Sequence, residues 1–156
     1  MTIPTYFHIG VVVPDLQRAM DDFSRILGLT FTEPALVKVP EFVDPEPHEH
    51  LVHVAFSEDG PPYYELIEAS GDGIFSKREQ GKILYLGMWE TDMETRIKTL
   101  EANGVGLAAQ LKTDPDATPF CIITEPDVLG IRLEYVDVNE QQSIETWVST
   151  GVFSGV

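Results

Sequence analysis

The sequence predicts a single α+β domain, in which two tandem βαβββ modules form a cupped, mixed β-sheet with helices on its outside. Three observations predict this fold. Strand-like and helix-like patterns alternate along the 156 residues, turn residues separate them, and one pattern recurs at a constant offset. The repeat is strong support because several independent positions must agree. One core is sufficient, since a chain of this length buries about 70% of its unfolded surface.

The first module covers about residues 5–75. Residues 6–13 are rich in β-branched and aromatic types and end at Pro14, which cannot continue a central strand. Asp15 is a good N-cap, and apolar residues at helical spacing follow it until Gly28, which ends the predicted helix. The remaining strands of this module are expected at 30–39, 51–57 and 63–68.

The second module covers about residues 82–138. Residues 85–93 lie over residues 8–16 at a constant offset of 77, with glycine matching glycine and aspartate matching aspartate. A second helix follows and ends at Gly104. Later strands are expected at 120–124 and 130–137. The tail, residues 139–156, forms either a short helix or a frayed end.

The composition excludes several classes of partner. The chain has 26 acidic and 10 basic side chains, and a net charge of −16 repels polyanions such as nucleic acid. No apolar run approaches the roughly 18 residues that cross a bilayer, so no membrane association is expected. The N-terminus lacks the pattern of a secretory signal, and the one cysteine, Cys121, cannot form an internal disulfide. These features predict a cytoplasmic protein.

Side chains alternate between the two faces of a strand, so packing one face against a helix leaves the other face open to the cup. This rule places His8, Glu65 and Glu134 in the cup, because the apolar residues beside them suit the core. It places His53 there too, if the neighbouring valines lie under a helix. A carboxylate within an apolar strand is costly to bury unless a metal, an arginine or a substrate pairs with it. The matching positions of Glu65 and Glu134 therefore favour a functional site over a solvated surface.

Residues 7–16, followed by Leu27-Gly28-Leu29, resemble the opening signature of the vicinal-oxygen-chelate superfamily. This superfamily includes glyoxalases, methylmalonyl-CoA epimerases, extradiol dioxygenases, and fosfomycin and bleomycin resistance proteins. The resemblance covers nearly the whole chain and implies four paired positions that bind one divalent cation. In this sequence the four positions are His8, Glu65, Tyr85 and Glu134. Tyr85 departs from the pattern, because a neutral phenol with an ordinary pKa of about 10 is a poor metal ligand.

The resemblance leaves three alternatives for the metal. His53 could replace the missing ligand; His8, Glu65 and Glu134 could hold the metal together with water; or the site binds no metal. An imidazole and two carboxylates suit zinc, nickel, cobalt, manganese or iron as the divalent cation.

The resemblance also implies a reaction class, namely an isomerase, epimerase or lyase that forms an enolate next to a carbonyl of a small-molecule substrate. With a metal, the ion would polarise the carbonyl and Glu65 or Glu134 would be the base. Without a metal, His8 and Tyr85 could donate hydrogen bonds to the oxyanion while a glutamate abstracts the proton.

The ligand is expected to be fairly apolar. Tyr63, Trp89 and Phe120 are the predicted walls of the cup, and cations that would hold a CoA thioester are scarce. The alternative function is a non-catalytic protein that sequesters an intact ligand, as resistance proteins of the same superfamily do. An extradiol dioxygenase is disfavoured because Tyr85 stands where that site requires a histidine. The resemblance also implies a homodimer.

Overall fold

The computed structural model of the protein describes residues 5–128 and 130–155. Within these residues, strands and helices follow the expected alternation. The first half contains β1 (His8–Val13), α1 (Leu16–Leu27), β2 (Ala35–Val43), β3 (Pro47–Phe56) and β4 (Tyr63–Glu68). The second half contains β5 (Ile83–Glu90), α2 (Met93–Ala102), β6 (Leu107–Lys112), β7 (Cys121–Thr124) and β8 (Arg132–Asp137). The other helices are α3 (Gln141–Thr150) and the short 3-10 helices η1 (Lys77–Glu79) and η2 (Val138–Glu140).

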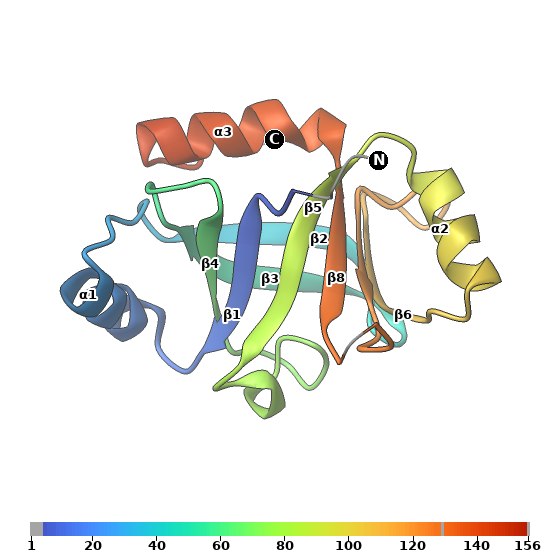
Figure 1. Cartoon of the computed structure of the whole chain (residues 1–156), viewed down its shortest axis with the longest axis horizontal. Helices are drawn as coiled ribbons and strands as arrows, with labels where there is room; N and C mark the ends of the chain where they lie inside the picture. Colours follow the sequence, from blue (N-terminus) through green and yellow to red (C-terminus); the bar gives the residue numbers. More distant parts are fainter. Residues whose placement is uncertain (1–4, 129, 156) are drawn as a thin grey trace.

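The strands form one curved sheet that closes into a barrel-like cup, in the order β1-β4-β3-β2-β6-β7-β8-β5 (Figure 1). β1 pairs with β4, and β5 with β8, in parallel, whereas the other neighbours are antiparallel. This mixed, cupped sheet confirms the predicted α+β fold class. The strand order is the same in both halves, as a repeat would produce, although the tandem modules themselves stay a prediction.

The sequence pattern did not locate β6. Its residues, Leu-Ala-Ala-Gln-Leu-Lys, include no β-branched or aromatic side chain, and alanine, glutamine and lysine favour helices. Pairing with β2 on one side and β7 on the other makes this segment a strand. Tertiary context has therefore overridden local propensity here.

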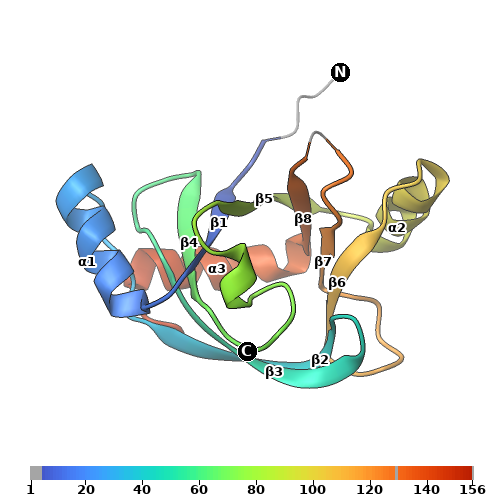
Figure 2. The same cartoon turned by 90° about the horizontal axis from the view of Figure 1, so that it is seen from below.

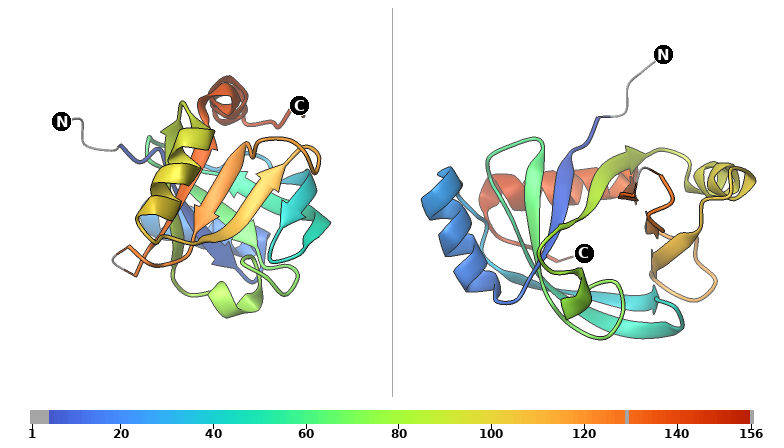
Figure 3. Two further views of the ribbon diagram at one scale, coloured as in Figure 1. Left: turned by 90° about the vertical axis from the view of Figure 1, so that its right-hand side faces the viewer. Right: turned by 60° about the horizontal axis from the view of Figure 1, so that its bottom comes forward.

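α1 and α2 lie outside the sheet on opposite sides of the barrel (Figure 3). Each begins at an aspartate whose side chain accepts a backbone hydrogen bond, from Arg18 to Asp15 at 2.9 Å and from Thr95 to Asp92 at 3.0 Å. α1 ends at Gly28, whose φ of 72° lies in the left-handed region that favours glycine. Asp15 and Gly28 are the residues that the sequence predicts at the two ends of α1, and Asp92, the repeat counterpart of Asp15, caps α2 in the same way.

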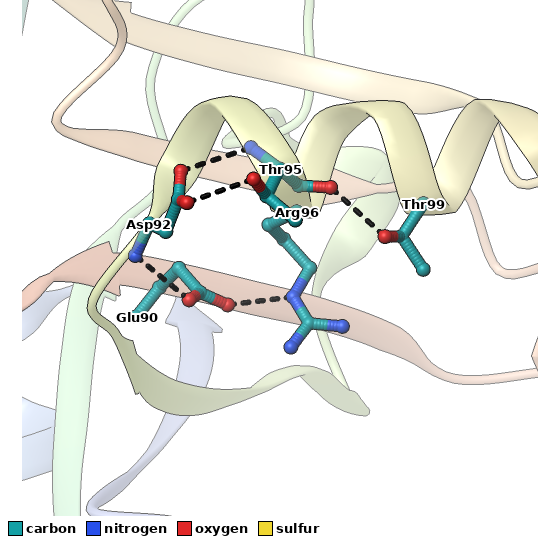
Figure 4. A network of polar contacts seen from close by, with 5 residues as sticks. All are labelled: Glu90, Asp92, Thr95, Arg96 and Thr99. Atoms are coloured by element: carbon teal, nitrogen blue, oxygen red, sulfur yellow. Dashed lines mark hydrogen bonds and ion pairs between the residues drawn. The ribbon is translucent and has the colours of Figure 1, made fainter.

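A polar network fastens α2 to the sheet (Figure 4). Glu90, at the end of β5, accepts hydrogen bonds from Arg96 Nε at 2.6 Å and from the Asp92 backbone at 3.0 Å. The Arg96 guanidinium also lies 4.7 Å from the centre of the Tyr135 ring on β8. Because Glu90 is buried, this pairing also compensates for the cost of its desolvation.

α3 crosses one end of the barrel, and the segment that contains η1 lies across the other end (Figures 1 and 2). The tail is thus a helix rather than a frayed end. This helix covers one end of the cup, whereas α1 and α2 lie outside the sheet. Trp147 and Val148 bury the apolar face of α3 against the interior of the barrel. None of the described helices is long and apolar enough to span a membrane.

The largest hydrophobic cluster lies inside the barrel, and two smaller clusters lie under α1 and α2. This distribution contradicts the prediction that the valines of β3 lie under a helix. Val52, Val54 and Phe56 belong to the interior cluster, so His53 faces outward. The prediction assumed that the apolar face of every strand packs under a helix, but the interior of this cup is itself apolar.

Candidate active site

Two aromatic rings pack against two glycines where β1 and β5 run side by side. His8 lies opposite Gly87, and Tyr85 lies opposite Gly10. A Cβ atom on Gly87 would overlap the His8 ring, and a Cβ atom on Gly10 would overlap the Tyr85 ring. The two matched glycines of the repeat therefore make room for the two rings that the same repeat places in the cup.

The two carboxylates come from the strands parallel to these. Glu65 on β4 lies beside Gly10, and Glu134 on β8 lies beside Gly87. The structure thus brings together His8, Glu65 and Glu134, as well as Tyr85. His8 Nε2 contacts Oε2 of Glu134 and lies 3.7 Å from Oε2 of Glu65. Whether these residues catalyse a reaction stays a prediction.

Two further hydrogen bonds complete the cluster. The Tyr85 hydroxyl donates to Oε1 of Glu65. The thiol of Cys121, on β7, donates to Oε1 of Glu134 with 3.0 Å between sulfur and oxygen. Alternation along residues 120–124 could have placed Cys121 in the cup, but nothing in the sequence indicates its contact with Glu134.

Burial and mutual charge shift the pKa values in this cluster. Burial lowers the pKa of His8, but Glu134 and Glu65 outweigh this effect and hold it above its ordinary value of 6.5. Burial, assisted by Glu134 and opposed by His8 and Tyr85, raises the pKa of Glu65 from 4.5 to about 7. Burial also raises the pKa of Tyr85 and of Cys121 well above their ordinary values, so both remain protonated donors near neutral pH.

The cluster opens onto a cavity of about 360 Å³. Its wall includes valine side chains of β2 and β3 and several aromatic side chains, and Ile144 and Trp147 of α3 close one side. Phe120 lines the cavity as predicted. Tyr63 and Trp89 are not among its lining residues; Trp89 stacks instead on Phe7, with 3.7 Å between ring centres. The contribution of α3 was missed because the tail had no assigned structure.

His53 does not take part in this site. Its side chain is 37% exposed on the outer face of β3, where Nδ1 lies 3.4 Å from Oε1 of Glu68. The cavity is lined instead by its neighbours Val52 and Val54. The prediction that His53 faces the cup, and could supply a missing metal ligand, is therefore wrong, since the strand register turns it away.

Comparison with known proteins supports this fold. Residues 7–121 match the family model of the glyoxalase/bleomycin resistance protein/dioxygenase superfamily. The chain belongs to this superfamily. The matched residues contain β1 to β6 and reach the start of β7. Membership confirms the resemblance on which the four paired positions were assigned, whereas superfamily members differ in reaction, so it assigns none to this chain. No curated protein matches the chain significantly in sequence.

Solved structures of the superfamily fold are similar at low sequence identity. Methylmalonyl-CoA epimerase from Mycobacterium tuberculosis is 19% identical with a TM-score of 0.59, covering 85% of this chain and 87% of its own. A hypothetical protein from Bacillus halodurans is 21% identical with a TM-score of 0.61, covering 87% and 95%. A Streptomyces coelicolor methylmalonyl-CoA epimerase variant bound to 2-nitronate-propionyl-CoA is 17% identical with a TM-score of 0.60, covering 87% and 98%. At these identities the likeness shows the fold alone.

Members of the superfamily commonly bind divalent metals. An imidazole and two carboxylates are suitable ligand types. Their arrangement is not suitable, because His8 and Cys121 already engage the two oxygens of Glu134, and Tyr85 engages Glu65. Neither ring nitrogen of His8 makes a hydrogen bond of acceptable geometry, whereas a metal-bound histidine almost always donates its other N–H to a partner. Among residues 5–128 and 130–155, no group of three or more His, Cys, Asp or Glu side chains could hold a metal ion. The residues therefore do not fit a metal.

Proposed function

We propose that this protein is an isomerase or epimerase that moves a proton at the carbon next to a carbonyl of an uncharged, mainly apolar ligand. The observation that carries this proposal is the environment of Glu65. Its carboxyl has a pKa of about 7 and lines an apolar cavity beside two hydrogen-bond donors, His8 and Tyr85. A general base works best when its pKa lies near the operating pH, and few carboxyl groups do.

Each residue of the cluster has a distinct chemical task in this reaction. Glu65 takes the proton from the carbon, and the resulting enolate is protonated at a neighbouring carbon in an isomerisation or on its opposite face in an epimerisation. Tyr85 donates to the ionised Glu65; once Glu65 has taken up the proton, the hydroxyl is released to donate to the oxygen on which negative charge develops. The positive charge of His8 stabilises that oxygen electrostatically where water is excluded. Glu134 supplies the negative charge that keeps His8 protonated. The buried charges are thus balanced within the protein, and no step requires a metal ion.

The charges around the cavity support an uncharged ligand. Glu65, Glu134 and Glu140 line the cavity, whereas Lys38 is the one lysine or arginine among the described lining residues. The Lys38 amino group is engaged 2.9 Å from a carboxylate oxygen of Glu49. A phosphate or carboxylate on a ligand would therefore lie among like charges without a free cation. This argues against a CoA thioester, although the similar structures include epimerases that bind one.

The second candidate function is sequestration of an intact ligand. The observation in its favour is the enclosure of the cavity by α3, which places Ile144 and Trp147 over bound ligand. Such a protein would bind apolar carbonyl compounds without transferring a proton. The two functions make opposite predictions for isotope exchange.

The test uses 2-tetralone, an uncharged aromatic ketone with exchangeable hydrogens next to its carbonyl. The protein is incubated with it in D₂O, and deuterium incorporation is followed by proton NMR. We expect the wild-type protein to accelerate exchange, and Glu65→Gln to reduce the acceleration at least about 100-fold, the usual contribution of a general base. Glu101→Gln, the same change at an exposed position on α2, is the matched control.

Each outcome separates the candidates. If Glu65→Gln exchanges deuterium at the wild-type rate, Glu65 is not the base. Binding of 2-tetralone, measured by calorimetry, without any exchange would favour the sequestering protein. Exchange by the wild type and by Glu101→Gln but not by Glu65→Gln would support the isomerase.

A further inference from the structure

Cys121 is a buried group of the site that the proposed reaction does not use. It lies at the start of β7, is 3% exposed, and lines the cavity. β7 pairs with β8 so that Ile123 lies opposite Glu134 and Cys121 lies opposite Val136. Alternation therefore places Cys121 and Glu134 on the same face of neighbouring strands, and the thiol lies 3.0 Å from Oε1 of Glu134.

The two oxygens of Glu134 have different partners. Oε1 accepts the hydrogen bond from Cys121, and Oε2 contacts Nε2 of His8. Glu134 is 5% exposed, so water has little access to its carboxylate and cannot readily replace either partner. Two fixed partners determine how the carboxylate group is rotated, whereas with His8 alone it could turn about its last side-chain bond.

The other carboxylate of the site has an equivalent donor. Tyr85 donates to Oε1 of Glu65, just as Cys121 donates to Oε1 of Glu134. Each glutamate is thus held by one neutral donor and faces His8 with its other oxygen. A neutral hydrogen-bond donor therefore holds the carboxylate on each side of the imidazole. The donor is Tyr85 at Glu65 and Cys121 at Glu134.

We propose that Cys121 is a positioning residue, whose S–H group holds the Glu134 carboxylate in the orientation in which its second oxygen meets His8. The catalytic consequence rests on the proposed function, but the orientation itself does not. A thiol is a weak donor, and burial keeps it protonated, so it can donate but does not compete with Glu134 for the charge of His8.

The orientation is tested by NMR of protein labelled with ¹⁵N-histidine, with the His8 signals assigned by comparison with His8→Gln. We expect the Nε2–H proton of His8 to resonate far downfield, because Nε2 contacts a carboxylate oxygen of Glu134. Cys121→Ala should shift this signal back or abolish it, and Cys121→Ser, which keeps an O–H donor, should retain it. Ile122→Val is the matched control, since it also removes one heavy atom from β7 but on the face under α2.

The catalytic consequence is tested by deuterium exchange into 2-tetralone. Cys121→Ala should lower the exchange rate about 3- to 10-fold, as expected for loss of one modest hydrogen bond. The same substitution should have no further effect in a Glu134→Gln background, because a positioning residue acts only through the group that it positions.

The outcomes distinguish this inference from the proposed function. An unchanged His8 signal in Cys121→Ala, or a wild-type protein without a downfield His8 signal, would overturn it. An equal fall in exchange rate with Glu134 and with Gln at that position would overturn it too, because the effect would then be structural. If the His8 signal responds as expected but the wild type exchanges no deuterium, the positioning of Glu134 stands and the isomerase does not.

Discussion

At the scale of single residues, the site depends on two glycines as much as on its ionisable groups. Gly10 and Gly87 carry no chemistry, but each leaves the space in which an aromatic ring of the opposite strand lies. His8 and Tyr85 are both 1% exposed, so neither ring can move without displacing the side chains packed around it. The position of the donors is therefore fixed by the absence of two methyl groups.

We expect Gly87→Ala to destabilise the protein by about 1–3 kcal/mol, because the new methyl group forces the His8 ring off its position in a packed interior. It should also reduce exchange into 2-tetralone. Urea denaturation measures the change in the free energy of unfolding. Gly106→Ala is the control, since a methyl group there would meet the Glu125 side chain at 3.3 Å on the surface. Equal stability of the two variants would contradict the close packing of His8 on Gly87.

The raised pKa of Glu65 gives the exchange reaction a defined pH dependence. Only the ionised carboxylate can accept a proton, so the rate should rise as the pH increases through about 7. The rate should fall again at higher pH, where His8, whose pKa lies above 6.5, loses its charge. Exchange rates measured from pH 5 to 10 should give a bell-shaped profile. A rate that is already constant at pH 5 would show that Glu65 has an ordinary pKa.

The raised pKa of Glu65 also makes the free energy of unfolding depend on pH. The folded-state pKa of Glu65 is higher than 4.5, so folding favours its protonated form. This contribution is complete at low pH and is lost as the pH rises from about 4.5 through about 7. The free energy of unfolding of the wild type should therefore fall over this range relative to that of Glu65→Gln, as urea denaturation at several pH values would measure.

At the scale of elements, α3 has a different role from α1 and α2. The two outer helices are capped by aspartates and cover the sheet from outside, whereas α3 covers one end of the barrel and supplies part of the cavity wall. Its main contact is Trp147, which lies edge-on to Phe56 with 5.0 Å between ring centres. Phe56 in turn lies 6.0 Å from the His8 ring. Trp147 thus links α3 to the ring of His8 through Phe56, while Ile144 of the same helix lines the cavity directly.

We expect Trp147→Ala to lower the free energy of unfolding by about 3–5 kcal/mol, the usual loss for a large buried aromatic side chain. It should also weaken binding of 2-tetralone, because the cavity loses part of its wall. Urea denaturation and calorimetry measure the two effects. Glu145→Ala, an exposed position on the same helix, serves as the control. Unchanged ligand affinity in Trp147→Ala would show that α3 does not contact the ligand.

At the scale of the whole molecule, charge and topology act together. The net charge of −16 repels anionic ligands at a distance, and the glutamates that line the cavity repel them within the site. The closed sheet brings both halves of the chain to one cavity, so a single chain contains the whole candidate site. The homodimer implied by superfamily membership stays a prediction, as does the cytoplasmic location.

The arrangement of the donors also predicts how the whole protein responds to metal ions. Because His8, Cys121 and Tyr85 already engage the carboxylates, we expect the purified protein to contain far less than one divalent ion per chain. Treatment with EDTA should leave the exchange rate unchanged. Elemental analysis and exchange assays measure these quantities. Near-stoichiometric metal that is lost in a His8→Ala, Glu134→Ala double variant would contradict the metal-free site and restore the metal-dependent alternative.

The sequence by itself determined the fold class and the convergence of His8, Glu65 and Glu134, and the superfamily resemblance added Tyr85 to this group. These were accessible because strand alternation and helix caps are local patterns of neighbouring positions. The repeat at an offset of 77 can likewise be recognised by comparing the sequence with itself. The same patterns missed β6 and placed His53 on the wrong face of β3. A strand of weak propensity depends on its partners, and an apolar face can lie against a helix or inside an apolar cup.

Only the tertiary structure decided how the site is connected. Tyr85 lies 20 residues from Glu65, and Cys121 lies 13 residues from Glu134, so their hydrogen bonds depend on strand pairing and not on spacing. The pairing of both carboxylates with protein donors, and the position of α3 over the cavity, likewise arise from contacts between distant segments. Periodicity indicates which face a side chain occupies, but its partners are set by the register between strands that the chain brings together in space.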